Sequence, residues 1–175
     1  MTGAVEIAQV PYGHCDVVGL TAEVQAYYEQ IYGGPDSTPM VDDDFAPPLG
    51  AFFVGYAGDR PVAMGGWRFH RTPIDLPAKH PAEIKRMYVV EHARGRGFAR
   101  LLLARLEETA RASGADATVL ETGRCQPMAI SLYRSSGYAD IPRFGYYACQ
   151  PDSVHLGKPL SRLAFEPPLL GDTER

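Results

Sequence analysis

The amino-acid sequence predicts an α+β fold in which a mixed, mostly antiparallel sheet is flanked by helices. Segments with the character of strands outnumber those with helical periodicity, and several strands follow one another without an intervening helix. The pattern indicates a single strand–helix–strand unit, formed by residues 82–90, 98–113 and 117–121. Antiparallel strands around one such unit are typical of an α+β sheet with helices on its faces.

The composition is that of an ordinary globular protein, with 175 residues of which 45% are hydrophobic and 22% charged. This length predicts one domain over residues 1–175, with residues 161–175 as a flexible C-terminal tail. The net charge of −4 does not indicate a general affinity for nucleic acids, and no apolar run is long enough to span a bilayer. Because the three cysteines form no CxxC pair and the first residues lack signal-peptide features, we expect a cytoplasmic protein.

The first 48 residues predict a strand, a helix and a long loop. Residues 5–10 alternate as a strand does, and Asp16 can cap a helix that ends at Gly33. The apolar positions of this helix are Val17, Leu20, Val24, Tyr27 and Ile31. Residues 33–48 show no periodicity, and a loop of this length is usually functional or disordered. Its acidic run, Asp42–Asp44, either attracts a cationic amine or forms a solvated surface.

The rest of the chain predicts further strands and two helices. In chain order these are a hairpin of strands 50–56 and 61–71, a strand 82–90, a helix 98–113, a strand 117–121, a helix 127–136, and strands near 137–141 and 153–160. The helix 98–113 has one apolar face and is closed by Gly114. Pro127 suits a first helical position, where its missing N–H would be unpaired in any case.

The segment Arg94-Gly95-Arg96-Gly97 joins a strand directly to the helix 98–113. The first N–H groups of a helix lack internal partners, and the helix dipole is positive at this end. Glycines allow a phosphate to approach these N–H groups, and arginines add positive charge. The segment therefore predicts an anion site, and the alternative is a solvated basic helix start with glycines that only shape a turn.

Other phosphate-binding motifs fit this segment less well. The P-loop pattern GxxxxGK[ST] is absent, and the dinucleotide pattern GxGxxG fails at its third glycine position, which is Arg100. Glu121 stands where a ribose-binding acid would end the next strand, so a dinucleotide site is an alternative. A dinucleotide domain, however, needs several parallel strand–helix–strand units, and this pattern indicates one.

Three segments together resemble the GCN5-related N-acetyltransferases, the GNAT superfamily. The residues Arg94-Gly95-Arg96-Gly97-Phe98-Ala99 match the family's pyrophosphate motif Q/R-x-x-G-x-G/A. The strand EIKRMYVV before it and the later segment QPMAISLYRSSGY resemble the family's central strand and C-terminal motif. The order of elements from Val5 to about Leu160 matches as well.

This resemblance implies an acetyl-CoA-dependent N-acetyltransferase in which the strands 82–90 and 117–121 splay apart to hold pantetheine. The unpaired backbone groups of such strands need partners, which the cofactor's amides would supply. The cofactor-binding residues implied in this way are Met87, Tyr88, Val89, Arg94, Gly95, Arg96, Gly97, Phe98, Ala99, Arg100, Gln126, Ala129 and Tyr133. The chain departs from many members at Gln126-Pro127, where they carry asparagine, and Gln126 is a substitute for that contact.

The resemblance also implies direct attack of an amine on the thioester, which needs a general base and is helped by a general acid. Tyr133 matches the usual acid, although it also fits the apolar face of a short helix. We expect Glu83 to be the base, acting directly or through water, although it also fits an exposed strand carboxylate. Glu121 is the other candidate for the base.

The remaining features leave the acceptor open. The histidines have no metal-like spacing, so no metal is expected. Cys125 lies near the expected thioester, but the sequence offers no residue to activate it. We expect the acceptor to be an amine of a small molecule or peptide, with no nucleic-acid or membrane partner and with a homodimer as a possible assembly. The alternative to an enzyme is a non-catalytic acyl-CoA-binding sensor of the same fold.

Overall fold

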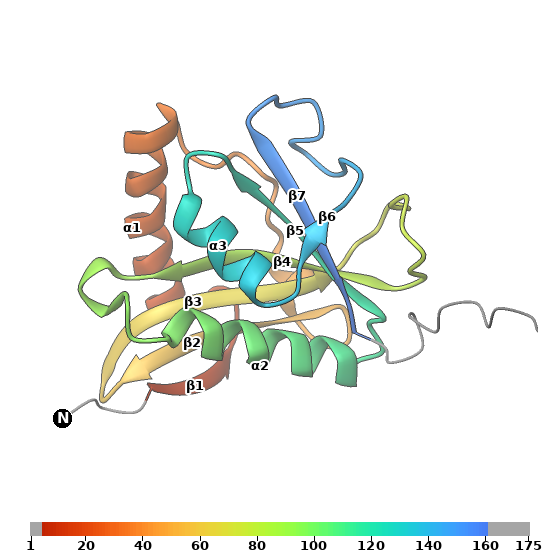
Figure 1. Ribbon diagram of the computed structural model, residues 1–175. Helices are drawn as coiled ribbons and strands as arrows, with labels where there is room; N and C mark the ends of the chain where they lie inside the picture. Colours follow the sequence, from red (N-terminus) through yellow and green to blue (C-terminus); the bar gives the residue numbers. More distant parts are fainter. Residues whose placement is uncertain (1–4, 161–175) are drawn as a thin grey trace, which may run out of the picture.

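A computed structural model describes residues 5–160 and shows one sheet with helices packed against it (Figure 1). In chain order the elements are β1 (Val5–Val10), α1 (Cys15–Tyr32), η1 (Asp42–Phe45), β2 (Gly50–Ala57), β3 (Arg60–Phe69), β4 (Pro81–Val89), η2 (Glu91–Ala93), α2 (Phe98–Ala112), β5 (Ala117–Gly123), α3 (Pro127–Ser135), β6 (Ala139–Asp140) and β7 (Ser153–Pro159). This order confirms the α+β class. The predicted C-terminal tail, residues 161–175, lies outside the described residues.

The strands form a seven-stranded sheet in the order β1-β2-β3-β4-β5-β7-β6. All neighbouring pairs are antiparallel except β4 and β5, which are parallel. These two strands pair only from Pro81 opposite Ala117 to Glu83 opposite Val119. Beyond this point they diverge, and Figure 1 shows β5 and β7 running at a steep angle to β4. The predicted splayed strand pair is therefore present.

The helices α1 and α2 cover opposite faces of the sheet. Successive side chains of a strand point to opposite faces, so Phe52 packs with Val17 and Val24 of α1, while Phe53 packs with the leucines of α2. Strands β2 and β3 are therefore buried on both sides. This explains why residues 50–56 are almost continuously apolar.

The start of α1 differs from the prediction. The helix is capped by His14, whose ring Nδ1 accepts a hydrogen bond from the Asp16 N–H at 3.3 Å. Asp16 lies in the first turn instead, and its carboxylate accepts a hydrogen bond from the Tyr56 hydroxyl at 2.7 Å. The helix ends at Gly33, in the left-handed conformation, as its sequence predicted.

The segment 33–48 is more ordered than its composition indicated, because Asp42–Phe45 forms the short helix η1. Asp42 and Asp43 are exposed, whereas Asp44 is buried and forms ion pairs with Arg68 and Arg71. The acidic run is therefore not a single solvated surface. Among residues 5–160, no helix combines the length and the apolar content needed to cross a bilayer.

Candidate active site

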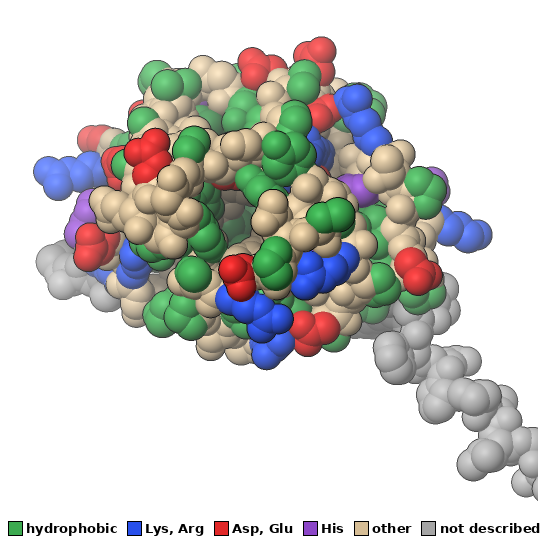
Figure 2. Space-filling view, turned by 90° about the horizontal axis from the view of Figure 1, so that it is seen from above, with side chains coloured by type: hydrophobic (Ala, Val, Ile, Leu, Met, Phe, Trp, Pro, Cys, Tyr) green, Lys and Arg blue, Asp and Glu red, His purple; other side chains and the backbone are tan. Residues whose placement is uncertain are grey.

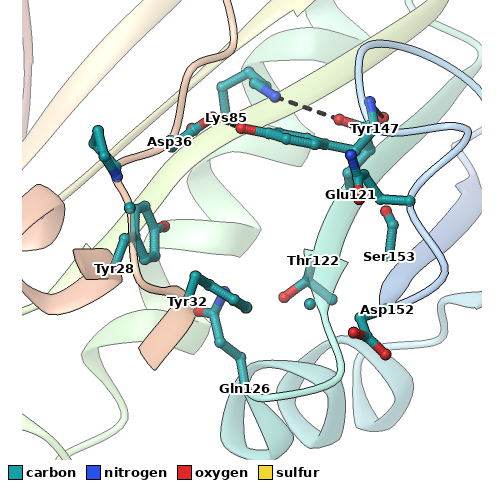
Figure 3. Close-up of a pocket in the computed structure, with 14 residues that line it drawn as sticks. Tyr28, Tyr32, Asp36, Lys85, Glu121, Thr122, Gln126, Tyr147, Asp152 and Ser153 are labelled. Atoms are coloured by element: carbon teal, nitrogen blue, oxygen red, sulfur yellow. Dashed lines mark hydrogen bonds and ion pairs between the residues drawn. The ribbon is translucent and has the colours of Figure 1, made fainter. Parts of the chain in front are cut away.

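A cavity of about 400 Å³ opens where β4 and β5 separate, between the C-terminal end of α1 and the segment that leads into β7. Figure 2 looks onto this end of the molecule and shows a hollow near its centre. The lining residues, most of them labelled in Figure 3, are Tyr28, Tyr32, Gly34, Pro35, Asp36, Lys85, Glu121, Thr122, Gly123, Gln126, Tyr147, Gln150, Asp152 and Ser153. The cavity thus lies at the strand split, the place where β4 and β5 diverge, and its walls include residues that are distant from these strands in the chain.

Glu121 is the buried acid of this cavity, with 5% of its side chain exposed. Its Oε1 accepts a hydrogen bond from the Tyr147 backbone N–H at 3.4 Å. Its Oε2 has no hydrogen-bond partner among the described residues, and the nearest cation, Lys85 Nζ, lies 3.8 Å away. Burial raises the pKa of Glu121 above its ordinary value, only partly opposed by the charge of Lys85.

Glu83 lies deeper in the same sheet, with 3% of its side chain exposed, and does not line the cavity. Arg68 Nε donates to its Oε2 at 2.9 Å, and Lys85 Nζ lies 3.4 Å from its Oε1. Burial alone would raise the pKa of Glu83, but the charges of Lys85 and Arg68 hold this pKa below its ordinary value. Glu83 is therefore a paired, weakly basic carboxylate and not the exposed strand residue of the alternative interpretation.

Lys85 lines the cavity, and β4 is irregular just beyond it, opposite Met64–Gly66 of β3. Within this irregularity Arg86 has a positive φ of 57°, which is unusual for a residue with a side chain. Its buried guanidinium lies 3.5 Å from Asp36 Oδ2. A bulge commonly re-aims side chains in this way.

Tyr147 covers the cavity and joins two distant segments. Its hydroxyl donates to Asp36 Oδ1 at 2.7 Å and accepts from the Ser37 N–H at 2.9 Å. In Figure 3 its ring lies between Asp36 and Glu121. Neither Tyr147 nor Asp36 carries a local sequence signal, because their roles depend on contacts between residues more than a hundred positions apart.

Tyr133 lies on the buried face of α3, where its ring packs 5.6 Å from that of Tyr138. Its hydroxyl has no hydrogen-bond partner within residues 5–160. Burial and, to a smaller extent, the neighbouring Tyr28 raise the pKa of Tyr133, so the hydroxyl stays protonated at neutral pH. Tyr28 lines the cavity, whereas Tyr133 is not among its lining residues.

The loop before α2 has the geometry of an anion site. Gly95 and Gly97 have positive φ values of 73° and 81°, and a Cβ on either would meet open space. Within the described part of the chain, the N–H groups of Gly95, Arg96, Gly97, Phe98 and Ala99 donate no hydrogen bond. Such a run of unpaired N–H groups at a helix N-terminus suits a phosphate.

The arginine side chains of this loop mostly contact the protein itself. Arg94 Nε donates to the Val89 carbonyl at 3.0 Å, and its guanidinium lies over the rings of Tyr27 and Tyr88. Arg100 donates to the hydroxyls of two serines at the end of α3. The backbone N–H groups predicted from the sequence are therefore available for an anion, whereas the side chains of Arg94 and Arg100 are already engaged.

The other predicted cofactor residues are spread along the split. Met87 and Ala129 are partly buried against the core on the α2 side, and the Phe98 side chain is buried on the α1 side. Gln126 Nε2 donates to the Tyr32 hydroxyl at 2.8 Å. Beyond Glu83 the edge of β4 that faces β5 has no strand partner, so its backbone groups remain available.

The sequence did not indicate one group of residues whose side chains are of types that can bind a metal ion. The ligand atoms of His14, Cys15 and Asp16 all lie within 4.8 Å of one another at the start of α1. His14 already caps the helix and Asp16 already binds Tyr56. Cys125 and Cys149 are exposed and free.

Comparison with known proteins agrees with this geometry. The family model described as the acetyltransferase (GNAT) family matches residues 21–138. An IAA acetyltransferase of Azospirillum brasilense is 36% identical over 144 residues, which make up 82% of this chain and 90% of the relative.

Solved structures share the fold. A candidate acyl-CoA N-acyltransferase from Klebsiella pneumoniae has a TM-score of 0.74 at 26% identity, covering 91% of this chain and 99% of its own. An IAA acetyltransferase from Bacillus cereus has a TM-score of 0.61 at 19% identity, and the match covers 89% of this chain and 99% of the Bacillus chain. At that lower identity the likeness concerns the fold alone.

Proposed function

Because the chain belongs to the acetyltransferase (GNAT) family, we propose that it transfers an acetyl group from acetyl-CoA to a primary amine of a small molecule or peptide. One observation carries the proposal. A buried carboxylate oxygen of Glu121 faces a cavity, without a hydrogen-bond partner in the described residues, at the point where β4 and β5 separate. A cytoplasmic location and a homodimer stay predictions from the sequence.

The residues of the split fit acetyl-CoA. The N–H groups of Gly95 to Ala99 would hold its pyrophosphate, and the free edge of β4 near Met87 would pair with its pantetheine amides. When bound, the cofactor supplies an activated acyl thioester. The protein's own contribution is to orient the acceptor, exclude water and move protons.

Glu121 is our choice for the general base. A primary amine is an ammonium ion at neutral pH, so it must lose a proton before it can attack. Glu121 Oε2 is free to accept this proton, whereas both oxygens of Glu83 face cations. The raised pKa of Glu121 also makes it the stronger base of the two. We therefore propose Glu121 in place of the Glu83 expected from the sequence.

Tyr133 keeps its proposed role as the general acid. Its hydroxyl is protonated and has no partner within residues 5–160, so it is free to donate to a departing thiolate. It does not line the cavity itself, but the charge of Tyr28, which does line it, influences the Tyr133 hydroxyl. The alternative is that the ring only packs the core.

The purified protein should be incubated with acetyl-CoA and a panel of primary amines, amino acids and peptides. We expect acceptor-dependent release of thiol, together with a product whose mass is increased by one acetyl group. Binding of acetyl-CoA without thiol release for any acceptor would favour the non-catalytic sensor. If CoA failed to raise the melting temperature, where a native-state ligand should do so by mass action, the cofactor assignment would be wrong.

A further inference from the structure

One carboxylate of the charge network around the cavity is poorly compensated. The network contains the carboxylates of Asp36, Asp44, Glu83 and Glu121 and the cations of Arg68, Arg71, Lys85 and Arg86. Every one of these carboxylates except Glu121 has a cation within 3.5 Å. Glu121 shares Lys85 with Glu83 at the longer distance of 3.8 Å, so it is the least compensated carboxylate of the network.

A second unbalanced carboxylate lies at the mouth of the same cavity. Asp152 lines the cavity and is exposed, and its carboxylate has no ion pair or hydrogen bond with any of residues 5–160. Its charge reaches Tyr32: burial raises the pKa of the Tyr32 hydroxyl most, and the charge of Asp152 contributes in the same direction. Figure 3 shows Asp152 on the far side of the cavity from Tyr32.

The walls between the two carboxylates suit a cationic chain better than an anion. The rings of Tyr28, Tyr32 and Tyr147 line the cavity, and such faces contact methylene groups and attract ammonium ions. The cation that lines the cavity, Lys85, is already shared by two carboxylates, so it is poorly placed to bind an anionic acceptor.

Both carboxylates border the same cavity but come from different elements. Glu121 lies in β5, opposite His155 of β7, and Asp152 lies in the turn that precedes β7. A linear chain with a charged group at each end can therefore contact one carboxylate inside the cavity and the other at its mouth.

We propose that the acceptor is a linear diamine, a dication whose reacting ammonium meets Glu121 while its second ammonium meets Asp152 at the mouth of the cavity. This inference rests on the proposed amine acetyltransfer. It names Asp152 as a residue that determines specificity and not as part of the proton transfer.

Alkyl diamines of increasing length should be compared with monoamines of the same length, using kcat/KM with acetyl-CoA. We expect diamines to exceed matched monoamines by about fivefold, since an exposed ion pair is worth at most about 1 kcal/mol, a factor of about five. Asp152→Asn should remove about fivefold of kcat/KM for diamines and leave monoamines within about twofold. Rising salt should weaken the diamine preference of the wild type and not of the variant.

Asp59→Asn is a matched control, because Asp59 is an exposed aspartate in the turn between β2 and β3 and the variant changes the net charge equally. It should behave as the wild type. If monoamines and diamines were equally good acceptors, or if Asp152→Asn slowed both equally with an unchanged Tm, the diamine proposal would be overturned and the amine acetyltransfer would stand. If no amine were acetylated, both proposals would fail.

Discussion

Parallel replacement of Glu121 and Glu83 by glutamine should separate a catalytic carboxylate from a structural one. For Glu121→Gln we expect kcat to fall by about 10²- to 10⁴-fold, the usual contribution of a general base. The fold should be retained, because a glutamine oxygen can still accept the Tyr147 N–H and Lys85 keeps its contact with Glu83. The melting temperature at pH 7 should not fall, since this buried carboxylate is poorly compensated.

For Glu83→Gln the expected effect is on stability. Arg68 and Lys85 would lose a buried partner at 2.9 Å and 3.4 Å. Removing one member of a buried ion pair costs about 3–5 kcal/mol. The lower end, about 3 kcal/mol, applies here because Arg68 keeps its contact with Asp44. For a chain of this size that lowers Tm by roughly 6–12 °C.

The assay is kcat/KM against pH, with the acetyl-CoA Kd and Tm measured on the same preparations. Glu121 must be ionised to act as a base, so activity is lost as the pH falls through its pKa. Because that pKa is raised above 4.5, the acid limb of the wild type should lie above 4.5, and Glu121→Gln should lack this limb. If Glu83→Gln kept the wild-type Tm and lost activity while Glu121→Gln stayed active, the assignment of the base would be refuted.

Three further predictions concern the other parts of the site. Gly97→Val should raise the Kd of CoA by at least about tenfold in calorimetry, because a β-branched residue at a φ of 81° is strained and covers the N–H groups. An unchanged Kd would mean that the phosphate binds at another site. Tyr133→Phe should lower kcat by about 10- to 1000-fold with an unchanged Tm. The control Tyr138→Phe should instead lower the free energy of unfolding by about 1 kcal/mol, because Tyr138 loses the hydrogen bond between its hydroxyl and that of Thr118. A kcat of Tyr133→Phe within about twofold of wild type would leave Tyr133 as a core residue. Gly145→Ala would place a Cβ 2.7 Å from Glu121 Oε1, so kcat should fall by about 10- to 100-fold while CoA binding persists.

Most of the fold followed from local patterns in the sequence. Alternation, helical periodicity and the glycines at helix ends located the strands and the three α-helices, and the strand split followed from the family resemblance. The glycine loop that we propose to bind phosphate could also be located, because its glycines and its position before α2 are contiguous in the chain. The start of α1 was missed because a histidine cap is rarer than an aspartate cap.

The acceptor side could not be derived in this way, because its geometry depends on distant contacts. Tyr147 contacts Asp36, which is 111 positions away in the chain. The extent to which the charge of Glu121 is neutralised depends on Lys85, which also contacts Glu83. A sequence shows that Asp44 and Glu83 are acidic, but not that arginines from another strand and its following loop neutralise them.

The position of each glutamate relative to the strand split explains their different chemistry. Glu83 is the last residue of β4 paired with β5, and on its other side it stands opposite Arg68 of β3, so a cross-strand cation neutralises it. Glu121 lies two residues beyond the last paired position of β5, where the neighbouring strand has moved away. The separation that leaves backbone groups of β4 unpaired therefore also leaves Glu121 without a partner on β4, and on β7 it stands opposite His155, whose Nδ1 lies 3.8 Å from its Oε1. The poorly compensated carboxylate that we propose as the base is thus a consequence of the sheet's topology.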